Sequence, residues 1–185
     1  MTERGKQLYA TVNRQITELI DLIQTLDEPA MRRPCAGREK LGDGTVAACA
    51  QHTAHNYQRI GTFIATADRT SADHARGQRG GHQIPPFLRA LGHHAAEHSP
   101  RGADGHPHDE PYTAENTSPA DLIERLSAAR ENLSGITELT DRQLDSVPPK
   151  DSFRFCDGQR TLGQVLTGLF KHQDHQVRAL QSALS

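Results

Sequence analysis

The stretch TLGQVLTGLFKHQDHQVRALQSAL, residues 161–184, carries the clearest structural pattern of the chain. Its apolar residues recur at spacings of three and four, as they do on one face of an α-helix. The members of this stripe are Leu162, Val165, Leu166, Leu169, Val177, Leu180 and Leu184. The pattern predicts an amphipathic helix over 161–184 that buries one face against other elements.

Three other segments show the same periodicity. Helices are expected over residues 3–26, 45–68 and 118–136, the last beginning with Ser118 as N-cap and Pro119 in the first helical position. No pair of segments alternates as two paired strands would. The expected fold class is therefore all-α, a four-helix bundle.

The intervening segments have a different composition. Pro29 is expected to end the first helix, and residues 28–44 and 140–160 are read as connections. Residues 70–117 are rich in Gly, Pro, His and charge, and are read as an insertion or crossover between the second and third helices rather than a second domain. The whole chain, 1–185, is expected to form a single domain.

The composition argues against nucleic-acid-binding and membrane-spanning classes of protein. Only 35% of the 185 residues are hydrophobic, 4% are aromatic, and the mean hydropathy is -0.68. A net charge of -2 argues against nucleic acid as the main partner, which normally requires a clustered basic face. No segment approaches the roughly 18 apolar residues of a membrane span, and the N-terminal residues lack the apolar core of a signal peptide. A cytoplasmic protein with no membrane partner is expected.

Two histidine pairs stand at helical spacing, His52/His55 and His172/His175. Residues three apart lie on neighbouring spots of one helix surface. At about 100° per residue, His52 is expected at the edge of the apolar seam and His55 on nearly the opposite side. On the last helix, His172 lies at the edge of the stripe, His175 lies further out, and Gln176 lies closer in.

Three of these histidines form a candidate metal site. His52, His172 and His175 could hold a divalent zinc, nickel or iron ion and leave a position open for water or substrate. The alternative reading is that each imidazole simply straddles core and water. The sequence identifies no catalytic residue beyond these ligands.

Residues 93–108 hold a second concentration of histidines. Its members are His93, His94, His98, His106 and His108. They could bind metal loosely as a scavenging or delivery arm. A solvated loop with incidental histidines is the favoured reading.

Cysteines and basic residues offer weaker signals. Three cysteines, Cys35, Cys49 and Cys156, are too few and odd in number for a disulfide framework in the cytoplasm. Cys49 lies one turn before His52 and could be a ligand or a nucleophile, but it is expected to be a small buried core residue. The basic residues between 32 and 40 could hold an anionic thiol, although such charges are more often ordinary surface.

The stretches GDGTVAACAQH (42–52) and RTLGQVLTGLFKHQDHQVRAL (160–180) together resemble the second and last helices of the DinB/YfiT-like metal-dependent four-helix-bundle superfamily. Thiol-dependent transferases and mycothiol-dependent maleylpyruvate isomerases belong to that superfamily. The resemblance covers nearly the whole chain outside 70–117. It implies an up-down-down-up bundle with a long crossover between helices 2 and 3, a divalent metal at one end, and often a homodimer.

The resemblance also implies a ligand set, from which this chain departs. The family typically takes one metal-binding His from helix 2 and two, four residues apart, from the last helix. His52 and His172 match, but Gln176 stands where the third ligand is expected, so that His175 would substitute at spacing three. In a register shifted by one turn, Gly168 takes the place of the missing ligand. The chain also lacks the Trp with which helix 2 of many relatives begins.

Two functions of different classes follow from this resemblance. The first is a divalent-metal-dependent S-transferase, in which a low-molecular-weight thiol of the mycothiol type loses its proton on the metal and attacks an electrophilic small molecule. The second is a non-catalytic bundle with a degenerate metal site that binds and sequesters a small molecule. Gln176 in place of a histidine favours the second.

Overall fold

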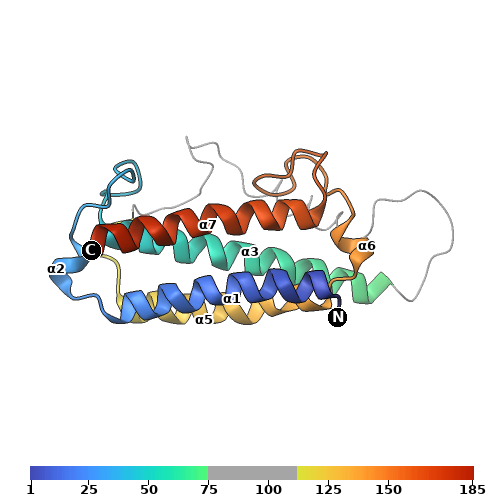
Figure 1. Cartoon of the computed structure of the whole chain (residues 1–185), viewed down its shortest axis with the longest axis horizontal. Helices are drawn as coiled ribbons and strands as arrows, with labels where there is room; N and C mark the ends of the chain where they lie inside the picture. The colour runs from blue at the N-terminus through green and yellow to red at the C-terminus, as the bar shows by residue number, and fades with distance from the viewer. Residues whose placement is uncertain (75–111) are drawn as a thin grey trace.

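The computed structural model describes residues 1–74 and 112–185, with side chains placed for all of these except 65–74. In this part of the chain, long helices pack side by side as an all-α bundle (Figure 1). They are α1 (Glu3–Gln24), α3 (Val46–His74), α5 (Pro119–Leu133) and α7 (Leu162–Leu184). The connections contain the short elements α2 (Glu28–Met31), η1 (Ser134–Glu138) and α6 (Asp141–Leu144).

The long helices enclose a single core. Figure 1 shows α1 and α7 running in one direction and α3 and α5 in the other. α1 packs against α5 and α7, and α3 packs against the same two helices. The buried apolar side chains come from all four, and include Ile16, Leu19, Ile60, Ile64, Leu126, Leu133, Leu166 and Leu169. The predicted apolar stripes therefore form the core. None of the described helices combines the length and the apolar character needed to cross a membrane.

The predicted helix starts are confirmed by their caps. The Ser118 hydroxyl accepts a hydrogen bond from the backbone N–H of Asp121 at the start of α5. Thr161 forms a reciprocal capping box with Gln164 at the start of α7. Such caps satisfy backbone donors that have no partner inside the helix.

Several details of the prediction are wrong, and one is that α5 ends at Leu133, where the 3-10 helix η1 follows it. α1 ends at Gln24, and Pro29 lies inside α2 rather than merely ending a helix. α6 forms within the predicted connection 140–160. α3 continues to His74, so residues 70–74 of the predicted insertion are helical.

Local hydrogen bonds account for the two short helices. Asp27 caps α2, and Thr140 forms a capping box with Gln143 at the start of α6. A helix of four residues is too short to show a hydrophobic period, so its capping residue is the only sequence signal that indicates it.

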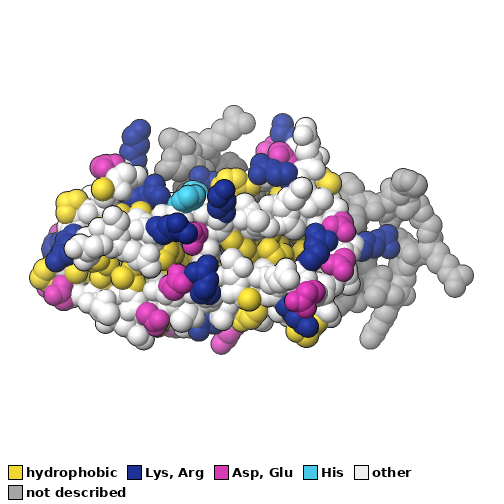
Figure 2. Space-filling view, in the orientation of Figure 1, with side chains coloured by type: hydrophobic (Ala, Val, Ile, Leu, Met, Phe, Trp, Pro, Cys, Tyr) yellow, Lys and Arg dark blue, Asp and Glu magenta, His cyan; other side chains and the backbone are white. Residues whose placement is uncertain are grey.

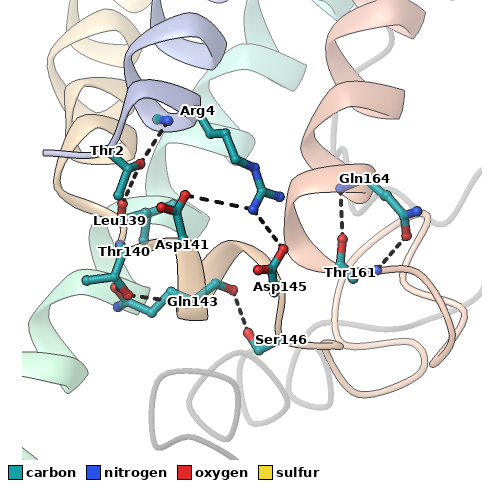
Figure 3. A network of polar contacts seen from close by, with 11 residues as sticks. Thr2, Arg4, Leu139, Thr140, Asp141, Gln143, Asp145, Ser146, Thr161 and Gln164 are labelled. Atoms are coloured by element: carbon teal, nitrogen blue, oxygen red, sulfur yellow. Dashed lines mark hydrogen bonds and ion pairs between the residues drawn. The ribbon is translucent and has the colours of Figure 1, made fainter.

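Polar contacts tie the start of α1 to α6 and to the chain that leads into α7 (Figure 3). Arg4 forms ion pairs with Asp145 at 2.7 Å and with Asp141 at 3.8 Å. The Thr2 hydroxyl donates to the carbonyl of Leu139 at 3.1 Å. These contacts fix the beginning of the loop 145–161, which carries part of the candidate site.

Candidate functional site

The loop 145–161 lies against both α3 and α7. The ring of Phe153 packs on Phe63 of α3, with centroids 4.5 Å apart. The ring of Phe155 lies 5.8 Å from the imidazole of His172 on α7. Phe153 therefore anchors the loop to α3, and Phe155 anchors it to α7.

A cavity of about 20 Å³ lies beneath this loop, between α3 and α7. That volume holds one water-sized group. The lining residues are Asn56, Arg59, Ile60, Phe153, Arg154, Phe155, Leu169, His172 and Gln173. The cavity thus combines apolar walls with amides, guanidinium groups and an imidazole.

Phe155 has an unusual backbone conformation, with φ at +77°. A bulky side chain is an outlier in this left-handed region, which costs on the order of 1–3 kcal/mol. Such residues gather at binding and catalytic sites, where the surrounding structure holds them in place. Because Phe155 lines the cavity, its strained backbone marks the cavity as a candidate binding site.

Gln173 provides the clearest unmet polar group of the cavity. Its side chain is 1% exposed, and its Oε1 atom has no hydrogen-bond partner in the part of the chain that the structure describes. Gln15 of α1, 2% exposed, offers a contrast: its Nε2 donates to the Phe170 carbonyl at 3.0 Å, and its Oε1 accepts from the Tyr57 hydroxyl at 3.1 Å. The buried amide of Gln15 is therefore satisfied, whereas the Oε1 atom of Gln173 is not.

Positive charge gathers around the same cavity. Burial and the neighbouring Arg154 guanidinium lower the pKa of Arg59. Burial is also the main cause that lowers the pKa of His172, followed by the charges of Arg154, Arg38 and then His175. The Nε atom of Arg38 is itself buried without a hydrogen-bond partner in the described structure. An anion placed here would offset this mutual repulsion.

On α3, the structure confirms the inward position of His52. Its side chain is 5% exposed, and its Nε2 lies 2.9 Å from Nδ2 of Asn56. The ring of Tyr112 covers it, with centroids 5.8 Å apart. His55 was expected to face solvent but is half-buried, because the same tyrosine ring lies 6.4 Å away.

On α7, the order of burial is the predicted one. Gln176 is 4% exposed, His172 is half-buried, and His175 is exposed. Nε2 of Gln176 lies 3.4 Å from Nε2 of His172, while its Oε1 accepts a long hydrogen bond of 3.9 Å from Sγ of Cys49. Burial raises the pKa of Cys49 to about 12, so this residue is a thiol at neutral pH rather than a nucleophilic thiolate.

These positions bear on the predicted metal site. Among the described side chains, no three His, Cys, Asp or Glu residues are grouped so that they could hold one ion, and His52, His172 and His175 are not brought together in this arrangement. A site with an open position normally takes three strong protein ligands, whereas Gln176 offers only an amide. The donor set around Gln176 does not fit such a site. Metal binding by the three histidines stays a prediction, and His93 to His108 lie outside the described residues.

Several residues of the cavity were not predicted from the sequence. Phe153 and Phe155 gave a usable signal, because two of only five phenylalanines fall in the triplet FRF. Gln173 lies three residues before Gln176 on the buried face of α7, and a polar residue on an apolar stripe is a second such signal. Asn56 gave none, since half-buried amides on helices are common.

A second depression, a groove of about 670 Å³, runs between α1 and α7. Figure 2 shows hydrophobic side chains along this seam, with charged side chains of both signs beside them. Two of its cations are paired with nearby carboxylates, Arg14 with Glu18 and Arg178 with Asp174. None of the buried, unpartnered side-chain N or O atoms of the described structure belongs to a residue named as lining this groove.

The geometry describes a helical bundle with a small polar cavity at the α3–α7 seam. It does not by itself assign the chain to a family. Comparison of the chain with protein-family models, with curated proteins and with solved structures gives no match.

Proposed function

We propose that this protein is a small-molecule-binding helical bundle that acts without catalysis. The binding site is the cavity beneath the loop 145–161, between α3 and α7. The observation that carries the proposal is the buried, unpartnered Oε1 of Gln173, a residue that lines this cavity. A ligand that donates a hydrogen bond would satisfy that atom.

The proposal explains two features that cost stability in the free protein. An unsatisfied buried acceptor costs about 1–3 kcal/mol, and leucine would fill nearly the same space without that cost. The positive φ of Phe155 adds strain at the same cavity. Residues that reduce stability are retained where function needs them.

A ligand screen tests this function. The full chain is screened by thermal shift against a library of neutral, acidic and basic small molecules, because a ligand that binds only the folded state raises the melting temperature. Hits are mapped by amide chemical shifts. We expect the largest changes in residues 56–60, 152–156 and 169–173.

Two variants make the screen specific. Gln173→Leu is expected to abolish the shift produced by a true ligand, and Gln58→Leu, on α3 but outside the cavity lining, is expected to preserve it. Ligands that bind Gln173→Leu as well as the wild type, or that map to the α1–α7 groove, would contradict the proposed site. A screen without hits would contradict the function.

A metal-dependent thiol S-transferase is the second candidate. The observation in its favour is the lowered pKa of His172, which keeps the imidazole in the neutral form that ligates metals. The buried His52 on α3 would be its partner ligand only if the two helices moved, because the structure does not bring the two histidines together. A divalent ion, when bound, would supply a stabilised thiolate; the residues themselves would only hold the ion.

Metal analysis separates the two candidates. Untagged wild type, His52→Ala and His172→Ala are analysed by inductively coupled plasma mass spectrometry. About one ion per chain in the wild type, lost in both variants, would favour the transferase and justify assays with thiols and electrophiles. No bound metal in a folded wild type would leave the binding protein as the function.

A further inference from the structure

The first turn of α3 and the loop before it hold one cysteine each, and the proposed binding function uses neither. We infer that Cys35 and Cys49 form a binding site for a soft monovalent ion, of which Cu⁺ is the biological example. The site is separate from the cavity beneath the loop 145–161, because neither cysteine lines that cavity. Three features carry the inference: the burial of both thiols, their interaction with each other, and a buried guanidinium donor without a partner.

The chain that leads into α3 brings the two cysteines to the same place. An isolated antiparallel bridge pairs Pro34 with Thr45, and the backbone N–H of Cys35 donates to the carbonyl of Gly44 at 2.8 Å. Cys49 lies one turn into α3, where its backbone N–H donates to the carbonyl of Thr45 at 3.0 Å. Backbone hydrogen bonds therefore tie both cysteines to residues 44–45.

Both thiols are free and almost inaccessible to solvent. Cys35 is 1% exposed and Cys49 is 0% exposed. Their side chains interact: after burial, the neighbouring Cys35 thiol is the largest cause that raises the pKa of Cys49. Two neighbouring thiols that are shielded from water offer a pair of donors to an ion that prefers sulfur.

The number of donors selects the ion. Zinc is held by three or four protein ligands. Among the side chains of the described ranges, no three His, Cys, Asp or Glu residues are grouped so that they could hold one ion. Cu⁺ is a soft ion that prefers sulfur, and two thiolates in a linear arrangement suffice to bind it. The pair of cysteines therefore suits Cu⁺ and does not suit Zn²⁺.

Binding of Cu⁺ leaves a negative charge that Arg38 can balance. Each thiol gives up its proton to the solvent, so that Cu⁺ and two thiolates form a complex with one net negative charge, which is costly in the interior without a cation nearby. The backbone N–H of Arg38 donates to the carbonyl of Cys35 at 3.0 Å, and its charge acts to lower the pKa of Cys49. The Nε atom of Arg38 is buried and has no hydrogen-bond partner in the described structure. A thiolate that holds Cu⁺ would give this N–H an acceptor.

Competition with the Cu⁺ chelator bicinchoninate tests the site on the reduced full chain without oxygen. Weaker sites lose Cu⁺ to the chelator, so only a tight site retains the ion. We expect about one retained Cu⁺ per chain, and we expect Zn²⁺ to bind at least about a hundredfold more weakly. X-ray absorption at the copper edge should show sulfur ligands alone.

Variants at five positions locate the ion. Cys35→Ala and Cys49→Ala are each expected to lose the retained Cu⁺, whereas Cys156→Ala, at the third buried cysteine, should keep it. Arg38→Gln changes the loop before α3 and leaves both thiols in place, so it tests the site even if the buried cysteines prove necessary for folding. It should weaken binding by at least about tenfold. Arg33→Gln makes the same charge change at an exposed position and should have no effect.

The outcomes separate this site from the other candidates. Retention of Cu⁺ by both cysteine variants, or nitrogen ligands in the absorption spectrum, would overturn the dithiol site. Equal affinity for Zn²⁺ would overturn the inferred ion. Loss of Cu⁺ in His52→Ala and His172→Ala, with Cys35→Ala unaffected, would assign the ion to the histidines instead. A ligand screen without hits would overturn the binding function at the cavity and leave the dithiol site standing.

Discussion

Nε2 of Gln176 lies 3.4 Å from Nε2 of His172, one helical turn along α7. The oxygen of the same amide accepts a hydrogen bond from Sγ of Cys49 on α3. An amide thus joins the two helices at the position where the resemblance to metal-dependent bundles implies a histidine. We predict that the identity of this one residue decides whether the position is a structural contact or part of a metal site.

Gln176→His is therefore expected to create or strengthen a metal site. The new imidazole would stand one turn from His172 and beside the Cys49 thiol, which gives three strong donors within reach of one ion. We expect the variant to bind about one Zn²⁺ or Co²⁺ per chain more tightly than the wild type, by at least about tenfold. Titration with Co²⁺ should show a sulfur-to-metal charge-transfer band.

Two further variants control this experiment. Gln176→Leu removes the amide without adding a ligand and should bind no more metal than the wild type. The double variant Gln176→His/Cys49→Ala should lose the charge-transfer band. If the wild type already binds as tightly as Gln176→His, the amide is not what limits metal binding.

Two buried glutamines should respond oppositely to replacement by leucine. Gln15→Leu leaves the Tyr57 hydroxyl without its partner and removes the second hydrogen bond of the helical Phe170 carbonyl, which together costs about 1–3 kcal/mol. Gln173→Leu removes an acceptor that has no partner, so the free energy of unfolding should stay the same or rise. Urea unfolding of both variants measures the contrast. A loss of stability in Gln173→Leu equal to that in Gln15→Leu would show that the Gln173 oxygen is satisfied in solution.

The lowered pKa of His172 predicts a loss of stability in acid. Burial, Arg154, Arg38 and His175 disfavour its protonation in the folded protein, whereas the unfolded chain takes up the proton near pH 6.5. The unfolded state therefore binds more protons below that pH, and the free energy of unfolding falls as the pH drops through this range. Above it, the contribution of His172 is constant.

Urea midpoints at pH 7.5 and 5.5 measure this effect. His172→Gln should lose less stability between the two pH values than the wild type. His175→Gln, whose side chain is exposed, removes only the smallest of the effects that lower the pKa of His172 and should lose nearly as much stability as the wild type. Equal pH dependence in all three proteins would show that protonation of His172 is not linked to folding.

The long helices could be predicted from the sequence because their signals are local and redundant. The stripe of α7 spans six turns and begins with the capping pair Thr161 and Gln164. The inward position of His52 and the ranking of Gln176, His172 and His175 followed from helical angles alone. The hydrophobic stripe indicates which face of the helix is buried, and the angle of a residue from that stripe then predicts how buried the residue is.

The cavity could not be predicted in this way because it depends on a loop. Phe153 and Phe155 contact α3 and α7 only because the loop 145–161, to which both belong, folds back over these two helices. Likewise, Tyr112 buries His55, which the helical angles had assigned to solvent. Contacts between loops and helices do not produce a periodic pattern in the sequence, so they cannot be predicted from one.

Two glycines in long helices should respond oppositely to alanine. A Cβ atom at Gly5 would lie 2.7 Å from the backbone carbonyl oxygen of Ile136, so Gly5→Ala forces α1 away from η1 and should cost about 1–3 kcal/mol. At Gly168, the nearest atom that a Cβ would meet is Nη1 of Arg160, 4.0 Å away. Gly168→Ala should therefore stabilise α7 by about 0.5–1 kcal/mol through the lower entropy of the unfolded chain. Thermal unfolding of both variants tests the pair, and a stable Gly5→Ala protein would mean that α1 and η1 are packed less closely than they are here.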